Sequence, residues 1–221
     1  MCRLALQSVA RFLRSVAYEQ VNDTSLRSAL RDARGFCNPH AYQWLREANS
    51  VLGTALIYRD VLQAALRELD VELRGGGGGR QRLGRWRGFR WRPSRQSVCP
   101  ACQAQSEAEA RYLQALLATL GAEASDSTAL DASDGACLPH LLAALRTSEP
   151  ATLRLVERAR RVVDTLSGEL DEIVRKEDYR FRHEERTPAE RSAPARAIAW
   201  AAGSQGVVPF QAQPPEPAAR P

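Results

Sequence analysis

Long hydrophobic runs are absent from this 221-residue chain. No stretch reaches eighteen consecutive apolar residues, and Arg3, Arg11 and Arg14 interrupt the N-terminal segment. A membrane-spanning helix needs about 20 apolar residues, and a secretory signal needs an uninterrupted apolar segment. We therefore expect a soluble, cytoplasmic protein that has no membrane partner.

Aromatic residues and lysine are also scarce. Aromatic side chains make up 6% of the chain, and strand-favouring residues are sparse beside the many alanines and leucines, which predicts an all-α protein. Of the 31 basic residues only Lys176 is a lysine. So strong a bias toward arginine can simply reflect a GC-rich genome, and this is the plainest explanation of any arginine cluster in the chain.

The chain has only five cysteines and three histidines, yet one Cys/His motif occurs twice. Residues 35–40 read GFCNPH and residues 135–140 read GACLPH. A shift of one hundred residues aligns 1–46 with 101–146 without a gap, and this alignment pairs Cys2 with Cys102, Cys37 with Cys137, and His40 with His140. A gapless period of this length predicts a duplicated helical unit.

The second copy contains four residues that are suited to binding a metal ion. Cys99, Cys102, Cys137 and His140 form a C-x-x-C pair and a C-x-x-H pair separated by thirty-four residues. Three thiolates and one imidazole suit tetrahedral zinc. We expect the first pair to lie in a tight turn, and Pro139 to be the first residue of a helix whose first turn includes His140.

Two other interpretations of these residues remain open. Cys99 and Cys102 could be a redox dithiol, as in thioredoxin-type proteins, because cysteine pairs in a reducing compartment serve either metal binding or redox chemistry. A redox C-x-x-C normally opens a helix within a βαβ unit, and the sequence indicates no such unit. Cys137 and His140 could also be ordinary buried residues.

The first copy has three of these candidate ligands: Cys2, Cys37 and His40. The counterpart of Cys99 would precede residue 1, so we expect an upstream start codon that supplies the fourth ligand. The alternative is a three-ligand zinc site with an open position, as catalytic zinc requires. No carboxylate–histidine pair lies near these residues, and His183 is remote in the sequence. The sequence therefore favours a protein that is not an enzyme.

The sequence predicts a division into four segments. Residues 1–74 form a first helical repeat with a partial metal site, 75–98 a flexible linker, 99–203 a second repeat with a complete metal site, and 204–221 a disordered, proline-rich tail. Hydrophobic periodicity predicts the helices. They are expected at 4–21, 25–33, 39–50, 53–73, 104–120, 127–131, from 139 onward, along a long segment from 151, and at 194–202. The apolar face expected for the long helix carries Leu155, Val156, Ala159, Val162, Val163, Leu166, Leu170, Ile173 and Val174.

The linker is rich in arginine and glycine. Eight arginines and the aromatic residues Trp86, Phe89 and Trp91 lie between residues 74 and 95, and these eight charges exceed the formal net charge of +5. Arginine binds phosphates and aromatic faces stack on bases, so this segment could contact single-stranded nucleic acid or RNA. The alternative is a solvated insertion without a partner.

The chain resembles a prokaryotic family of unknown function. The residues that carry the resemblance are YEQVND (18–23), RGFCNPHAYQW (34–44), GTALIYRDVL (53–62), CPAC (99–102), CLPH (137–140) and RKEDYRF (175–181). In that family, Cys-Pro-x-Cys and Gly-Phe-Cys-x-x-His motifs occur twice in a helical protein, and the resemblance covers roughly residues 1–203. This chain departs from the pattern in lacking the first Cys-Pro and in having Ala136 where a larger apolar residue is usual.

Together these features predict a zinc-stabilised helical binding or regulatory protein whose partner is nucleic acid or another protein. The first alternative is a thiol redox sensor that releases zinc when Cys99 and Cys102 are oxidised. The second alternative is a hydrolase with open zinc at Cys2, Cys37 and His40.

Overall fold

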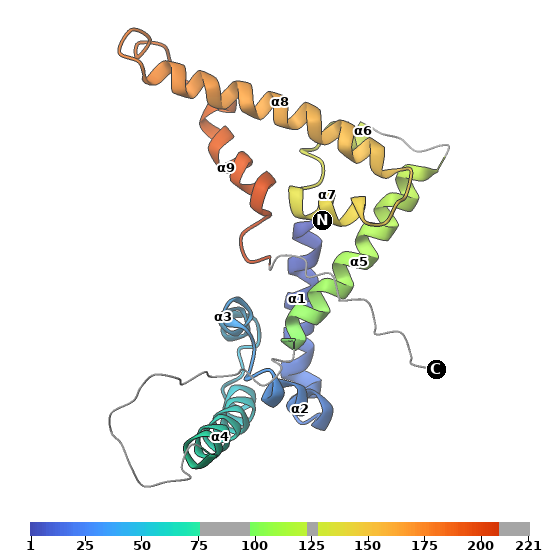
Figure 1. The fold of residues 1–221 in the computed structure, drawn as a ribbon, viewed down its shortest axis with the longest axis vertical. Helices are drawn as coiled ribbons and strands as arrows, with labels where there is room; N and C mark the ends of the chain where they lie inside the picture. Colours follow the sequence, from blue (N-terminus) through green and yellow to red (C-terminus); the bar gives the residue numbers. More distant parts are fainter. Residues whose placement is uncertain (76–97, 123–127, 208–221) are drawn as a thin grey trace. The chain divides into compact units, whose positions relative to one another are not determined.

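The computed structural model describes residues 1–75, 98–122 and 128–207, with the backbone alone for 71–75 (Figure 1). Every regular element in these ranges is helical, so the prediction of an all-α protein is confirmed for the described part of the chain. The linker at 75–98 and the tail at 204–221 lie almost entirely outside these ranges and stay predictions. None of the described helices is both long enough and apolar enough to cross a membrane.

The chain divides into two units, each with its own core. The α2–α4 unit comprises Gln7–Gln105, and the α7–α9 unit comprises Met1–Leu6 together with Ser106–Pro221. Helices α1 (Cys2–Ser15) and α5 (Pro100–Gly121) each contribute to both units. The duplication and the four-segment division expected from the sequence stay predictions.

The α2–α4 unit is built around the apolar face of α1. Val9, Leu13 and Val16 follow the spacing of one helical face and are fully buried. The other elements of this unit are the π-helical segment Val16–Gln20 and the helices α2 (Thr24–Asp32), α3 (Asn38–Glu47) and α4 (Val51–Gly75). Asp23 caps α2, because its Oδ1 accepts a hydrogen bond of 2.7 Å from the backbone N–H of Leu26.

The α7–α9 unit contains the remainder of α5, with α6 (Thr128–Asp131), α7 (Leu138–Leu145), α8 (Thr152–Glu177) and α9 (Pro188–Ala202). The long helix predicted after residue 151 is α8, and it buries the expected stripe of Leu155, Ala159, Val162 and Leu166. Val174 was expected on the same buried stripe, but it is 72% exposed. Val174 therefore lies off the buried face of α8, which continues to Lys176.

Helix α9 begins earlier than the sequence predicted. The expected start was Pro194, whereas the helix starts at Pro188 and contains Pro194 in its interior. The reason is a capping box: the Thr187 hydroxyl accepts from the N–H of Glu190, and the Glu190 carboxylate accepts from the N–H of Thr187. These two reciprocal bonds satisfy donors that would otherwise be left open at the helix start.

Candidate metal centres

All seven predicted metal ligands lie at helix starts. Cys37 and Cys137 immediately precede α3 and α7, and His40 and His140 lie in the first turns of these helices. The prolines at 39 and 139 are the second helical residues, one position later than expected, and proline is tolerated there because the first turn leaves its N–H groups unpaired.

The C-x-x-C pair has the same arrangement, which corrects the expectation of a separate tight turn. Cys99 immediately precedes α5, Pro100 is the first residue of that helix, and Cys102 lies in its first turn. A helix start therefore directs both sulfurs of CPAC to one side, as it does for each C-x-x-H pair.

Four of the seven residues form one cluster within the α2–α4 unit, which we call the four-residue cluster: Cys37, His40, Cys99 and Cys102. The Nδ1 atom of His40 lies 3.2 Å from Sγ of Cys37, 3.4 Å from Sγ of Cys102 and 3.8 Å from Sγ of Cys99. Sγ of Cys37 lies 3.4 Å from Sγ of Cys102. His40 and Cys99 are buried, so the cluster faces the protein interior.

The other three residues form a second cluster within the α7–α9 unit, which we call the three-residue cluster: Cys2, Cys137 and His140. Sγ of Cys2 lies 3.5 Å from Sγ of Cys137 and 3.6 Å from Nδ1 of His140. Nδ1 of His140 lies 2.9 Å from Sγ of Cys137.

The structure corrects the grouping that was expected from the order of the residues along the chain. Cys99 and Cys102 were grouped with Cys137 and His140, but they lie with Cys37 and His40. Cys2 was grouped with Cys37 and His40, but it lies with Cys137 and His140. Each cluster thus combines a C-x-x-H pair with cysteine from the other segment of the hundred-residue alignment or from the residues next to it.

Ionisation within the four-residue cluster is uneven. A hydrogen bond from the Cys102 thiol is the main factor that lowers the pKa of Cys99 to about 4. The same interaction with Cys99, together with burial, raises the pKa of Cys102. Burial also raises the pKa of Cys37. Without a metal ion, the cluster therefore holds one thiolate that is stabilised by neighbouring thiols.

The three-residue cluster has the same character. A hydrogen bond from Cys137, followed by one from His140, lowers the pKa of Cys2 to about 3, while the interaction with Cys2 raises the pKa of Cys137. Burial on its own would lower the pKa of His140, but the hydrogen bond to the Cys2 thiolate and the nearby carboxylate of Glu109 outweigh it and raise this pKa to about 9.

Glu109 is a residue that the sequence analysis missed. It lies on α5, is 2% exposed, and places Oε1 3.5 Å from Nε2 of His140. A signal was present in the sequence, because Glu109 precedes Leu113 and Leu117 at four-residue intervals on the buried face of the helix. A carboxylate on an apolar stripe is unusual enough to indicate a specific partner.

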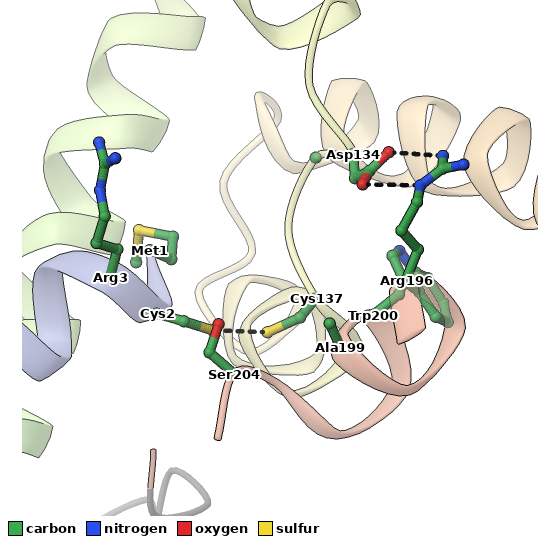
Figure 2. A pocket seen from close by; sticks show the side chains of 10 residues that line it. Met1, Cys2, Arg3, Asp134, Cys137, Arg196, Ala199, Trp200 and Ser204 are labelled. Carbon is green, nitrogen blue, oxygen red and sulfur yellow. Dashed lines mark hydrogen bonds and ion pairs between the residues drawn. The ribbon is translucent and has the colours of Figure 1, made fainter. Parts of the chain in front are cut away.

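A cavity of about 230 Å³ lies beside the three-residue cluster. Figure 2 shows Cys2 and Cys137 facing each other at its wall, with Ser204 next to Cys2. Arg196 also lines the cavity, and ion pairs with Asp134 and Glu169 hold its guanidinium. Cys2 and Cys137 of this cluster therefore border an open space.

Both clusters can hold a metal ion. In each one the ligand atoms lie within 4.8 Å of one another, and sulfur and imidazole nitrogen are ligands that soft and borderline metals prefer. The four-residue cluster offers a full tetrahedral set, whereas the described residues of the three-residue cluster offer three ligands.

Comparison with known proteins identifies the family. The family model described as "Family of unknown function (DUF6062)" matches residues 1–206, so the chain belongs to this family. The chain is also 27% identical over 207 residues to an "Uncharacterized 23.9 kDa protein in xynA 3'region" of Caldicellulosiruptor sp. (strain Rt8B.4), covering 93% of this chain and 95% of the relative. No solved structure matches the chain.

Proposed function

We propose that this member of the DUF6062 family is a zinc-stabilised helical protein that holds one ion in each Cys/His cluster. In this proposal it acts as a binding or regulatory module and is not an enzyme. The observation that carries the proposal is the spacing of the ligand atoms in the four-residue cluster.

A tetrahedral zinc ion has characteristic ligand-to-ligand distances. Zn–S bonds of about 2.3 Å and Zn–N bonds of about 2.0–2.1 Å place two sulfurs roughly 3.8 Å apart, and a sulfur and a nitrogen roughly 3.6 Å apart. The S–S distance of 3.4 Å and the S–N distances of 3.2–3.8 Å in the four-residue cluster are close to these values. The side chains would therefore need only small adjustments to bind zinc.

Metal binding would contribute to folding. Cys37 and Cys102 are 65 residues apart in the sequence, and a shared ion would join the starts of α3 and α5. The ligands must be deprotonated to bind, and a formed site is absent from the unfolded chain, so the binding free energy adds to the stability of the fold. Four protein ligands leave no open position, which is typical of a structural zinc site.

The hydrolase alternative loses the ligand set on which it depended. An open site at Cys2, Cys37 and His40 would need these three residues together, whereas Cys37 and His40 lie with Cys99 and Cys102. The clustering of these residues supports a structural role for the ion that they would hold.

A thiol redox sensor is the second candidate. The observation in its favour is that CPAC opens a helix, as redox C-x-x-C motifs do, and that the pKa of Cys99 is lowered to about 4. Oxidation by hydrogen peroxide would convert two thiols to one disulfide and reduce the peroxide to two waters. Reversible release of zinc, together with a disulfide found by peptide mapping, would favour this candidate over a purely structural site.

The binding role is proposed from the arginine-rich linker. Its arginines and the aromatic residues between 86 and 91 suit contact with RNA or single-stranded DNA. Deletion of residues 75–95 should abolish RNA binding and its dependence on salt concentration. RNA binding that the deletion leaves unchanged would exclude the linker as the contact.

Metal analysis of the full chain tests the central proposal. Protein purified without added zinc should contain two equivalents of zinc per chain, and a strong chelator should remove the metal and lower the melting temperature. A chain that contains no stoichiometric metal, and whose stability the chelator leaves unchanged, would contradict the proposal.

A further inference from the structure

The carboxyl group of Glu109 lies in a place that water does not reach. Its side chain is 2% exposed and lies on the buried face of α5 within the α7–α9 unit. Burial of an ionised carboxylate is costly unless the charge is paired. The imidazole of His140 is a titratable group that faces this carboxylate, with Nε2 at 3.5 Å from Oε1.

The two nitrogens of His140 face different partners. Nδ1 lies 2.9 Å from Sγ of Cys137 and 3.6 Å from Sγ of Cys2, while Nε2 faces Glu109. A carboxylate positioned to accept a hydrogen bond from Nε2–H favours the tautomer that carries its proton on Nε2, and this tautomer leaves the lone pair on Nδ1 for a metal ion. The ring is thus held between the carboxylate and the two sulfurs.

His40 has a different environment in the four-residue cluster. The Nε2 atoms of both histidines are buried without a well-formed hydrogen bond among the described residues, but Nε2 of His140 has a carboxylate oxygen 3.5 Å away, whereas Nε2 of His40 makes no ion pair within the described part of the chain. In the hundred-residue alignment Glu109 pairs with Val9, which is fully buried in the core of the α2–α4 unit. Among the described residues, a carboxylate therefore faces the histidine of one cluster and not that of the other.

The formal charges of the two clusters suggest why only one of them needs a carboxylate. With a divalent ion, three thiolates give the four-residue cluster a net charge of −1, while two thiolates leave the described ligands of the three-residue cluster neutral. Glu109 brings the second value to −1 as well. Its position next to His140 places this charge on the far side of the imidazole from the ion.

We propose that Glu109 is a positioning residue of the three-residue cluster, which orients His140 with Nδ1 toward the ion. It also supplies the negative charge that a third thiolate supplies in the four-residue cluster. This inference rests on the proposed metal binding. The metal affinity of the three-residue cluster then depends on Glu109, and that of the four-residue cluster does not. Loss of this carboxylate should therefore weaken metal binding at the first cluster and leave binding at the second unchanged.

The variant Glu109→Gln tests this role, because it keeps the size of the side chain and removes its charge. Loss of a carboxylate that supports a metal-bound histidine typically costs 10–100-fold in metal affinity. Competition with a chromophoric chelator should show this loss for one of two Co²⁺ ions, with a shift in the visible d–d bands of that ion. The variant Cys137→Ser identifies the spectrum of the four-residue cluster alone.

Glu107→Gln is the matched control, because it makes the same change of charge at an exposed position of the same helix. Both Co²⁺ affinities of this control should equal those of the wild type. Two unchanged affinities in folded Glu109→Gln would overturn the inference and leave the proposed metal binding intact. A wild-type chain that binds no second ion would instead contradict the proposed function itself.

A measurement on the wild type covers the case in which Glu109→Gln does not fold. The chain has three histidines, so ¹⁵N-histidine NMR of the ¹¹³Cd-loaded protein is readily assigned. We expect cadmium coupling to Nδ1 of His140 and a protonated Nε2 whose hydrogen is shifted further downfield than that of His40. Coupling of cadmium to Nε2 of His140 would overturn the inference.

Discussion

Sγ of Cys37 lies 3.4 Å from Sγ of Cys102, although 65 residues separate them in the sequence. The hundred-residue shift maps this pair onto Cys137 and Cys2, whose Sγ atoms lie 3.5 Å apart across 135 residues. The same relationship therefore occurs in both clusters, and in each it joins the two halves of the sequence alignment. Cysteines from different halves of the alignment lie together, and the cysteines of one half are divided between the two clusters.

This exchange predicts which pairs of cysteines share an ion. The double variant Cys37→Ser/Cys99→Ser should retain one zinc equivalent, because both residues belong to the four-residue cluster. The double variant Cys99→Ser/Cys137→Ser should retain none, because each substitution removes a ligand from a different cluster. Elemental analysis after gel filtration in the presence of a weak chelator measures both values. One zinc equivalent retained by the second variant would support the grouping by repeat instead.

The local parts of both clusters were predictable from the sequence, whereas their pairing was not. The spacing C-x-x-C or C-x-x-H shows that two ligands can share one helix start, because the first turn of a helix directs both toward the same side. This property is local. Which two helix starts meet depends on how α1, α3, α5 and α7 pack, and no spacing within a motif contains that information.

The helices show a similar limit. Hydrophobic periodicity located the stripe of α8, because burial along one face imposes a period of 3.6 residues. It did not locate the start of α9, where the reciprocal bonds of Thr187 and Glu190 begin the helix six residues before Pro194. Glu109 was missed although its helix was expected. Its neighbour His140 lies in another helix, and spacing within the sequence does not relate the two residues.

The ion pair between Lys176 and Glu190 predicts a pH dependence of stability. The single lysine of the chain places Nζ 2.9 and 2.8 Å from the two carboxylate oxygens of Glu190 and 3.1 Å from the carbonyl oxygen of Glu185. The hydrogen bond from Lys176 is the main factor that holds the pKa of Glu190 below its ordinary value. A lowered pKa in the folded state stabilises the fold above the unfolded-state pKa of about 4.3, and this contribution is lost as the pH falls through the folded-state value.

Glu190→Gln should therefore melt at a lower temperature than the wild type at pH 7, and the difference should shrink below about pH 4. Thermal unfolding followed by circular dichroism between pH 7 and 3 measures it. Glu157→Gln, at an exposed position of α8, should match the wild type throughout. A difference between Glu190→Gln and the wild type that stays constant down to pH 3 would show that the carboxylate acts through packing and not through its charge.

Gly203 predicts a link between backbone conformation and the three-residue cluster. It ends α9 with φ +84° and ψ 176°, a region that essentially only glycine occupies. A Cβ atom at this position would lie 3.7 Å from Sγ of Cys2 and 3.9 Å from Sγ of Cys137, which are ordinary contacts. The available space therefore permits alanine, and the backbone conformation does not.

Gly203→Ala should lose about 1–3 kcal/mol of stability, because alanine is strained in this backbone conformation. It should also weaken metal binding at the three-residue cluster alone, because relief of the strain would move the chain away from both sulfurs. Gly168→Ala is the matched control: Gly168 is inside α8, a Cβ atom added there would meet no other described atom within 4 Å, and alanine should stabilise the helix by about 0.5–1 kcal/mol. Urea denaturation of the zinc-loaded chain and Co²⁺ titration measure the two effects. Equal loss of affinity at both clusters in Gly203→Ala would show a general loss of structure, whereas selective loss would show that the end of α9 supports the sulfurs of Cys2 and Cys137.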